Sequence, residues 1–246
     1  WRERKKELNT RFLQTLAHAF ERSSAYRERY AAAGIHLSAV QSLEDIEKLP
    51  LLRMTELMER QRKVFPFGGF EILDPKDLHR IYVNPGLLFQ PGGPFESQDT
   101  SWAQALCGAG FKAGDCIINT FNYHFWPLAR VMEENVTRIG AKVVPAGSGN
   151  TMMQVKIMQM LQVNGFLGTP SFLTTLAQRA EAMGLDLKKD VFLEKALVGA
   201  EMLPESLRTR LQEKLDMTVR QLYGTVFLGC IGFECEAMSG LHVPDS

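Results

Sequence analysis

An alternation of short apolar runs with amphipathic stretches, between residues 140 and 223, constrains this chain more than any other feature. Apolar runs occupy residues 142–145, 166–167, 196–198 and 219–222. Amphipathic stretches occupy residues 152–162, 172–183 and 204–215 between them. Runs this short are typical of buried strands, and a helix supplies the long crossover that a parallel strand pair needs. The pattern predicts an α/β fold, a mostly parallel sheet with helices on both faces.

Polar, glycine-containing corners follow the predicted strands. They occupy residues 147–151, 169–171, 199–201 and 223–224. In parallel sheets, ligands collect at the carboxyl ends of the strands. We therefore expect these corners to face one cleft, which makes them the candidate binding site.

Several fragments carry a resemblance to a known family: GSGNTMMQ at 147–154, GTPSFLTTLA at 168–177, VGAEMLP at 198–204, QLYG at 221–224, and the EC and GLHV of 233–243. In order and spacing they resemble the phenylacetate-CoA ligase branch of the AMP-forming acyl/aryl-CoA ligases, the adenylate-forming enzymes. The resemblance implies an incomplete large N-terminal domain of that type. We expect residues 1–79 to be a helical segment packed on the core, residues 80–246 to be the adenylate-binding core, and the C-terminal lid domain to be absent.

The resemblance implies activation of a small aromatic or apolar carboxylic acid to its CoA thioester through an acyl-adenylate, with ATP/AMP and CoA as cofactors. The residues that it assigns to the nucleotide are Gly199, Ala200, Glu201, Tyr223, Gly224 and Thr225. In the family, the first three lie along the adenine, where small residues allow close approach, and the tyrosine packs on the base. We assign no catalytic residue.

An aromatic segment follows the apolar run 116–121. The resemblance implies that Tyr123, His124, Phe125 and Trp126 line the acyl pocket, together with Thr169 and Pro170 of the second corner. The alternative interpretation is that Phe125 and Trp126 belong to the core and that His124 is a helix-start residue with a satisfied hydrogen bond. Both readings of this segment stay open at the level of sequence.

Two motifs depart from the family at the groups that handle charge. Where the family has a phosphate loop of the form S-S-G-T-T-G-K-P, residues 83–94 read VNPGLLFQPGGP. Asn84, Gly86, Gly92 and Gly93 remain as a degenerate phosphate loop without its hydroxyls and lysine. After Tyr223 and Gly224, residues 225–227 read Thr-Val-Phe, so the phosphate hydroxyl and the glutamate that holds Mg²⁺ are missing. These losses make Mg²⁺ doubtful. They also raise an alternative function, a catalytically impaired or repurposed member that binds a ligand or partner without ATP turnover.

Composition excludes several other classes. The 28 basic residues balance the 28 acidic ones, which argues against a nucleic-acid partner. No apolar run approaches the roughly 20 residues of a membrane span and no signal peptide is visible, so we expect no membrane partner and a cytoplasmic location. A small acid, a nucleotide and CoA are the expected partners, and a homodimer is the assembly to test.

The four cysteines form neither CxxC pairs nor a disulfide framework. Cys230, Cys235 and His242 have a C-x4-C-x6-H spacing compatible with a structural zinc site, for which Cys235 and His242 are the candidate ligands, but such a site needs four ligands. Reduced thiols beside a surface histidine are the favoured interpretation.

Overall fold

The computed structural model describes residues 2–93, 100–225 and 227–244, and these residues form two compact units, Trp1–Pro94 and Phe95–Ser246. The first unit begins with two helices, α1 (Arg2–Arg22) and α2 (Ser24–Ala32), as the sequence allowed. A short 3-10 helix η1 (Leu37–Ala39), a second one η2 (Leu43–Lys48), helix α3 (Met54–Lys63) and the 3-10 helix η3 (Pro75–Asp77) follow.

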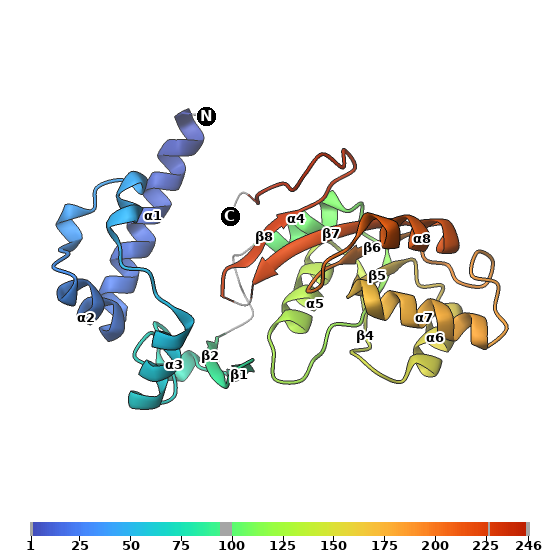
Figure 1. The fold of residues 1–246 in the computed structure, drawn as a ribbon, viewed down its shortest axis with the longest axis horizontal. Helices are drawn as coiled ribbons and strands as arrows, with labels where there is room; N and C mark the ends of the chain where they lie inside the picture. Colours follow the sequence, from blue (N-terminus) through green and yellow to red (C-terminus); the bar gives the residue numbers. More distant parts are fainter. Residues whose placement is uncertain (1, 94–99, 226, 245–246) are drawn as a thin grey trace. The chain divides into compact units, whose positions relative to one another are not determined.

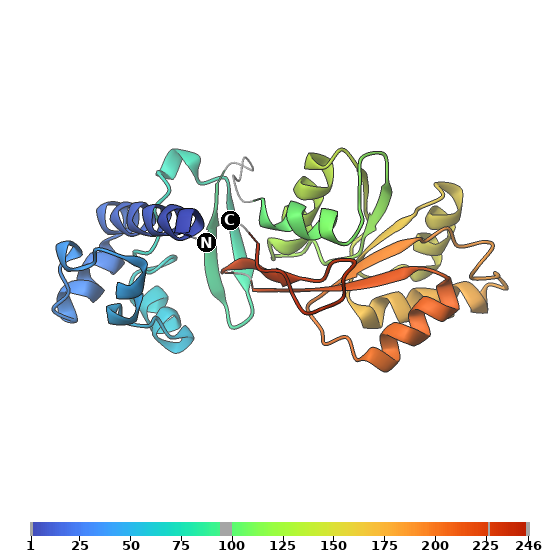
Figure 2. The same cartoon turned by 90° about the horizontal axis from the view of Figure 1, so that it is seen from above.

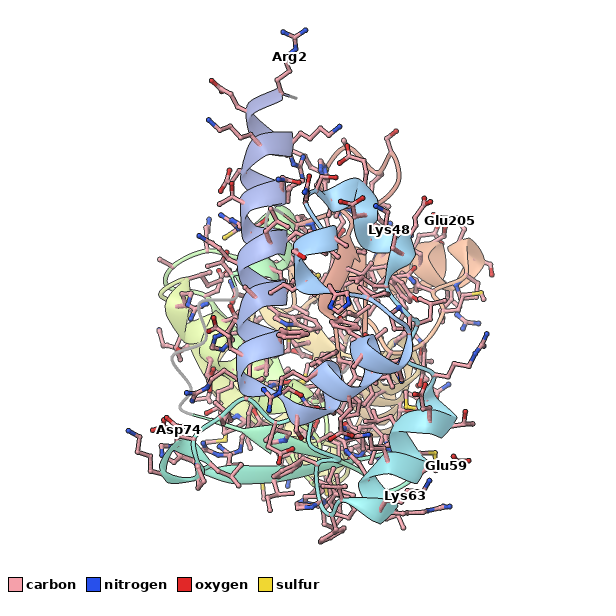
Figure 3. The ribbon with its side chains drawn as sticks, turned by 90° about the vertical axis from the view of Figure 1, so that its left-hand side faces the viewer. Arg2, Lys48, Glu59, Lys63, Asp74 and Glu205 are labelled. Carbon is pink, nitrogen blue, oxygen red and sulfur yellow. The ribbon has the colours of Figure 1, made fainter. Side chains whose placement is uncertain are left out.

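The helices of the first unit bury a small apolar cluster of their own. Leu16, Tyr30 and Val40 are its buried members. The charged side chains of these helices point outwards. Figure 3 shows Arg2, Lys48, Glu59 and Lys63 projecting from the helices into solvent. An amphipathic helix buries one face and leaves the other to water, which accounts for this division.

The first unit ends in a hairpin, not in a strand of the main sheet. Strand β1 (Arg80–Asn84) pairs antiparallel with β2 (Leu88–Gly92), and Asn84 lies opposite Leu88. The two strands form a sheet by themselves (Figure 1). The hairpin therefore groups with residues 1–79, and the compact units divide after residue 94, not at the predicted boundary after residue 79.

The second unit is built on a six-stranded sheet with the order β4-β3-β5-β6-β7-β8. Its parallel strands are β3 (Cys116–Asn119), β4 (Lys142–Pro145), β5 (Gly165–Gly168), β6 (Lys195–Val198) and β7 (Thr218–Thr225). Strand β8 (Gly229–Phe233) turns back antiparallel on β7 at one edge. The sheet is thus mostly parallel, as the sequence predicts.

Helices cover both faces of this sheet. Helices α4 (Ser101–Gly108) and α5 (Leu128–Arg138) pack on one face, where Leu106 and Met132 are fully buried. Helices α6 (Thr151–Met160), α7 (Pro170–Ala182) and α8 (Glu205–Leu215) pack on the other, where Leu173 and Leu211 are buried. Figure 2 shows α4 and α5, in green, on the opposite side of the sheet from α7 and α8, in orange. The predicted α/β architecture is confirmed.

Local details differ at the ends of elements. Helix α3 begins at Met54, and its N-cap is Arg53, whose side chain makes no capping bond. Strand β8 has no counterpart in the sequence prediction, because its GCIGF run is interrupted by glycine. No helix in the described part of the chain is both long and apolar enough to cross a bilayer.

Candidate nucleotide and acid site

The corners that follow the parallel strands lie side by side along one edge of the sheet. The amides of Ala146 and Gly147, after β4, both donate to the carbonyl of Asn119 at the end of β3, each at 3.0 Å. The hydroxyl of Thr120 donates to the carbonyl of Leu167 in β5 at 2.8 Å. Farther along, the amide of Gly199 donates to the carbonyl of Gly168 at 3.1 Å. Parallel strands bring their carboxyl ends to one edge, and the corners therefore lie along it, whereas the cleft that they were expected to face stays a prediction.

Gly199 is the point at which the corner after β6 approaches β7. A Cβ at this position would lie 2.7 Å from Cδ1 of Leu222 and 3.2 Å from the Leu222 carbonyl oxygen. Any other residue would require the buried Leu222 side chain to move. The next residue, Ala200, has a φ of +64°, a left-handed backbone that alanine rarely adopts. The corner 199–200 is therefore held in a specific, uncommon shape beside Leu222 and Tyr223.

A carboxylate links this corner to the one after β5. The hydroxyl of Ser171 donates to Oε1 of Glu201 at 2.8 Å, and the Ser171 amide donates to Oε2 at 3.3 Å. Thr169 caps α7 by accepting the amide of Phe172 at 3.2 Å, and Pro170 occupies the first helical turn. Thr169, Pro170 and Glu201 are thus neighbours, as the sequence predicted, although the Ser171 contact was not anticipated.

Tyr223 lies on β7 at the same edge with its side chain 54% exposed. The pairing of β7 with β8 shifts register between Tyr223 and Gly224, which marks a bulge. Bulges re-aim side chains at the ends of paired strands. The hydroxyl of Thr225 accepts the amide of Leu228 at 3.1 Å, which anchors the turn to β8. An exposed aromatic ring next to a glycine corner is an arrangement suited to stacking on a planar base.

The aromatic segment after β3 is exposed at its tip. The side chain of Phe125 is 73% exposed, its φ is +64°, and Trp126 and His124 are also exposed. The alternative that Phe125 and Trp126 are core residues is therefore wrong. The His124 amide donates to the side chain of Asn122 at 2.8 Å. An exposed apolar tip of this kind is suited to an apolar ligand.

Tyr123 differs from its three neighbours because it is half-buried. Its hydroxyl accepts a hydrogen bond from Nδ2 of Asn119 at 2.9 Å. Burial raises the pKa of this phenol well above its ordinary value, and the nearby Glu133 carboxylate raises it further. Tyr123 is therefore a neutral, anchored ring that supports the loop, and sequence reasoning did not distinguish it from the exposed aromatics.

The four residues of the predicted phosphate loop do not form one loop. Asn84 and Gly86 lie at the turn of the hairpin, whereas Gly92 ends β2 and Gly93 follows it. Since a strand advances about 3.3 Å per residue, the five residues of β2 separate the two pairs by more than 10 Å. The prediction of a single loop over these four positions is wrong.

The amides of this hairpin are also engaged. The side-chain amide of Gln61 accepts the amide of Phe89 at 2.9 Å and donates to the Phe89 carbonyl at 2.7 Å. Leu88 is buried within β2. Asn84 is buried and donates to Gln90 at 3.1 Å, while its own Oδ1 is unpaired. The exposed donors of the turn are those around Gly86 and Leu87. Pro94 and Val226, at the ends of the two altered motifs, lie outside the described residues.

Cys235 and His242 are in direct contact. Nε2 of His242 lies 3.0 Å from Sγ of Cys235, and the imidazole stacks on Phe233 with ring centroids 5.6 Å apart. Backbone hydrogen bonds between residues 233 and 242 hold this geometry. Within the described residues, no cluster of three or more His, Cys, Asp or Glu side chains has the geometry of a metal site. A zinc ion at this pair stays a prediction.

No family model matches the chain. It is 26% identical over 216 residues to the phenylacetate-coenzyme A ligase of Pseudomonas putida, covering 85% of this chain and 48% of that protein. It is 26% identical over 242 residues to the phenylacetate-coenzyme A ligase of Thermus thermophilus, covering 95% and 53%.

A solved structure shares the fold. The open conformation of a 2-hydroxyisobutyryl-CoA ligase superposes with a TM-score of 0.91 at 22% identity, covering 97% of this chain and 54% of that one. The chain spans about half the length of the curated relatives that it matches. The chain is thus similar in sequence to phenylacetate-coenzyme A ligases over about half of their length, and it shares the fold of a 2-hydroxyisobutyryl-CoA ligase.

Proposed function

We propose that this chain is the adenylate-binding part of an AMP-forming CoA ligase that acts on a small aromatic or apolar carboxylic acid. The observation that carries the proposal is the continuous row of corners 146–147, 119–123, 168–171, 199–201 and 223–225 along one edge of the sheet. Supporting comparisons are the phenylacetate-coenzyme A ligases and the 2-hydroxyisobutyryl-CoA ligase, which was crystallised with 2-HIB-AMP and CoA.

The residues of this edge fit an adenylate and an apolar acid. Gly199 and Ala200 leave backbone, without bulky side chains, beside the exposed ring of Tyr223, which suits a planar base. Phe125 and Trp126 supply exposed apolar surface for the acid. ATP, when bound, would supply the adenylyl group for the acid's carboxylate, with pyrophosphate as the leaving group. CoA would then take the acyl group as a thioester, with AMP as the leaving group. The chain's own residues bind and orient the base and the acid.

The described residues of this edge fit a magnesium ion less well than they fit an adenylate and an apolar acid. Mg²⁺ prefers carboxylate and other oxygen ligands in octahedral geometry. The corner 223–225 carries no carboxylate, and Glu201 is engaged with Ser171. We therefore derive no step through a metal ion.

ATP turnover is tested by pyrophosphate release. With ATP, Mg²⁺ and a panel of aromatic and aliphatic acids, we expect release that depends on the acid and is largest for a small aromatic acid such as phenylacetate. The natural full-length protein is the material to use, because the relatives are about twice as long. AMP binding in a calorimeter without any pyrophosphate release would contradict the ligase assignment and identify a ligand-binding protein that has lost turnover.

Tyr223→Ala tests the position of the base. Loss of the exposed ring removes the stacking surface, and we expect AMP affinity to fall about tenfold in a calorimetric titration. Phe192 provides a matched control because it is an exposed aromatic that precedes β6, at the opposite edge of the sheet. Phe192→Ala should leave AMP affinity unchanged. If both variants change AMP affinity equally, the adenine does not stack on Tyr223.

A further inference from the structure

One buried side chain at this edge plays no part in the assignments above. Gln154 of α6 is almost completely buried, and its Nε2 donates to the carbonyl of Gly147 at 2.9 Å and to the carbonyl of Gly149 at 2.7 Å. Its Oε1 is buried without a hydrogen-bond partner. Leaving a buried acceptor unpaired costs about 1–3 kcal/mol, and the two hydrogen bonds that Nε2 donates to the loop offset this cost.

The loop that Gln154 holds has an unusual backbone. Gly147, Gly149 and Asn150 have φ values of +66°, +98° and +42°. Left-handed conformations in close succession do not form a regular element, so the loop depends on bonds from its surroundings. The side chain of Gln154 supplies two of these bonds. The backbone carbonyl of Asn119 accepts a third, from the amide of Gly147.

The same loop lies against the acid-binding side of the proposed site. A Cβ on Gly147 would lie 3.6 Å from Cδ2 of Tyr123. Tyr123 is in turn anchored by Asn119, which also donates to the carbonyl of Ala129 at 2.8 Å. Gln154, the loop, Asn119 and Tyr123 therefore form one connected set of contacts, and a shift of the loop would change the space next to Tyr123.

We propose that Gln154 is a positioning residue that determines the apolar selectivity of the acid-binding side, an inference that rests on the proposed function. Gln154 donates to the carbonyls of Gly147 and Gly149, and both acceptors are therefore engaged within the protein. The loop then presents no unpaired carbonyl of these two residues to the acid. A hydroxylated acid finds no acceptor there and pays for the desolvation of its hydroxyl, so the site selects the unsubstituted acid.

The test compares two acids on two proteins. Calorimetric titrations with phenylacetate and with 4-hydroxyphenylacetate, each in the presence of AMP, give the preference of the wild type and of Gln154→Met. Methionine has a similar shape but no donor, so the carbonyls are released. We expect the preference for phenylacetate to fall about tenfold, with AMP affinity unchanged. Lys156→Ala, an exposed position on the same helix, is the matched control and should keep the wild-type preference.

The outcomes are distinguishable. An unchanged preference in Gln154→Met, with normal AMP affinity, overturns the role of Gln154 and leaves the proposed function standing. A wild type that binds neither acid overturns both. If Gln154→Met fails to fold, Gln154→Asn replaces it, because asparagine retains an amide on a side chain one methylene shorter. A partial loss of the preference for phenylacetate in Gln154→Asn supports the proposal. An unchanged preference in that variant overturns it.

Discussion

Replacing Glu234 by alanine is expected to lower the free energy of unfolding by about 3–5 kcal/mol, because it leaves a buried guanidinium without its partner. The Arg208 side chain, on α8, is 5% exposed. It reaches the two carboxylate oxygens of Glu234 through two hydrogen bonds, each of 2.7 Å. The same carboxylate accepts the amide of Gln221 in β7 at 2.6 Å. Glu234 thus joins α8, β7 and the segment after β8.

The pKa directions agree with this picture. Burial alone would lower the pKa of Arg208, but the carboxylates of Glu234 and Glu205 outweigh it and raise the pKa. Glu205 is the matched control: it contacts Nε of the same arginine at 2.9 Å, but its side chain is 75% exposed. Exposed ion pairs contribute little, so Glu205→Gln should change stability by less than about 1 kcal/mol. Urea unfolding measures both variants, and similar losses for the two would refute the role of the buried pair.

Replacing Asp115 by alanine is expected to lower the free energy of unfolding by about 3 kcal/mol for the same physical reason. Lys195 in β6 is buried, and its ammonium lies 3.1 Å from Asp115. The carboxylate also accepts the amide of Lys112 at 2.8 Å and the side-chain amide of Asn164 at 2.9 Å. Without it, the lysine keeps the carbonyl of Gly110 at 3.3 Å and the exposed Glu194 at 3.7 Å.

Asp115 also predicts how stability depends on pH. Burial raises the pKa of this carboxyl, but the hydrogen bonds from Lys112, Asn164 and Lys195 outweigh it, and the net pKa is lowered. A carboxyl with a lowered folded-state pKa contributes stability above its unfolded pKa of about 3.9 and loses it as pH falls through the folded value. Wild type should therefore lose more stability than Asp115→Asn between about pH 6 and pH 3. Urea unfolding at the two pH values measures this difference. Equal losses of unfolding free energy in wild type and Asp115→Asn would contradict the lowered pKa of Asp115.

The candidate site could be predicted from sequence to the extent that it follows from strand order. Thr169, Gly199 and Tyr223 each follow or end a short apolar run, and parallel strands necessarily bring such positions to one edge. The hairpin could not be predicted in this way. Its second strand, LFQPG, contains proline and glycine and has no alternating pattern, so residues 83–94 read as a loop. The consequence was a phosphate loop placed over residues that the hairpin separates.

Contacts between side chains far apart in the sequence could not be predicted either. Gln154 reads as one polar residue of an amphipathic helix, yet it is buried against a loop of left-handed residues. Two strands, β7 and β8, separate Arg208 from Glu234 in the chain, and nothing in their spacing indicates an ion pair. Exposure of Phe125 was likewise undecided, because an aromatic residue after a strand suits either a core or a pocket.

The sequence by itself determined the fold class and the edge of the sheet along which the candidate corners lie, because hydrophobic periodicity sets element type and parallel topology sets where strands end. The tertiary structure alone decided which polar groups meet: Glu201 with Ser171, Gln154 with the carbonyls of the 147–149 loop, and Glu234 with Arg208. Hydrogen bonds depend on distances of a few tenths of an ångström between residues far apart in the chain, and those distances are set only when the helices pack on the sheet.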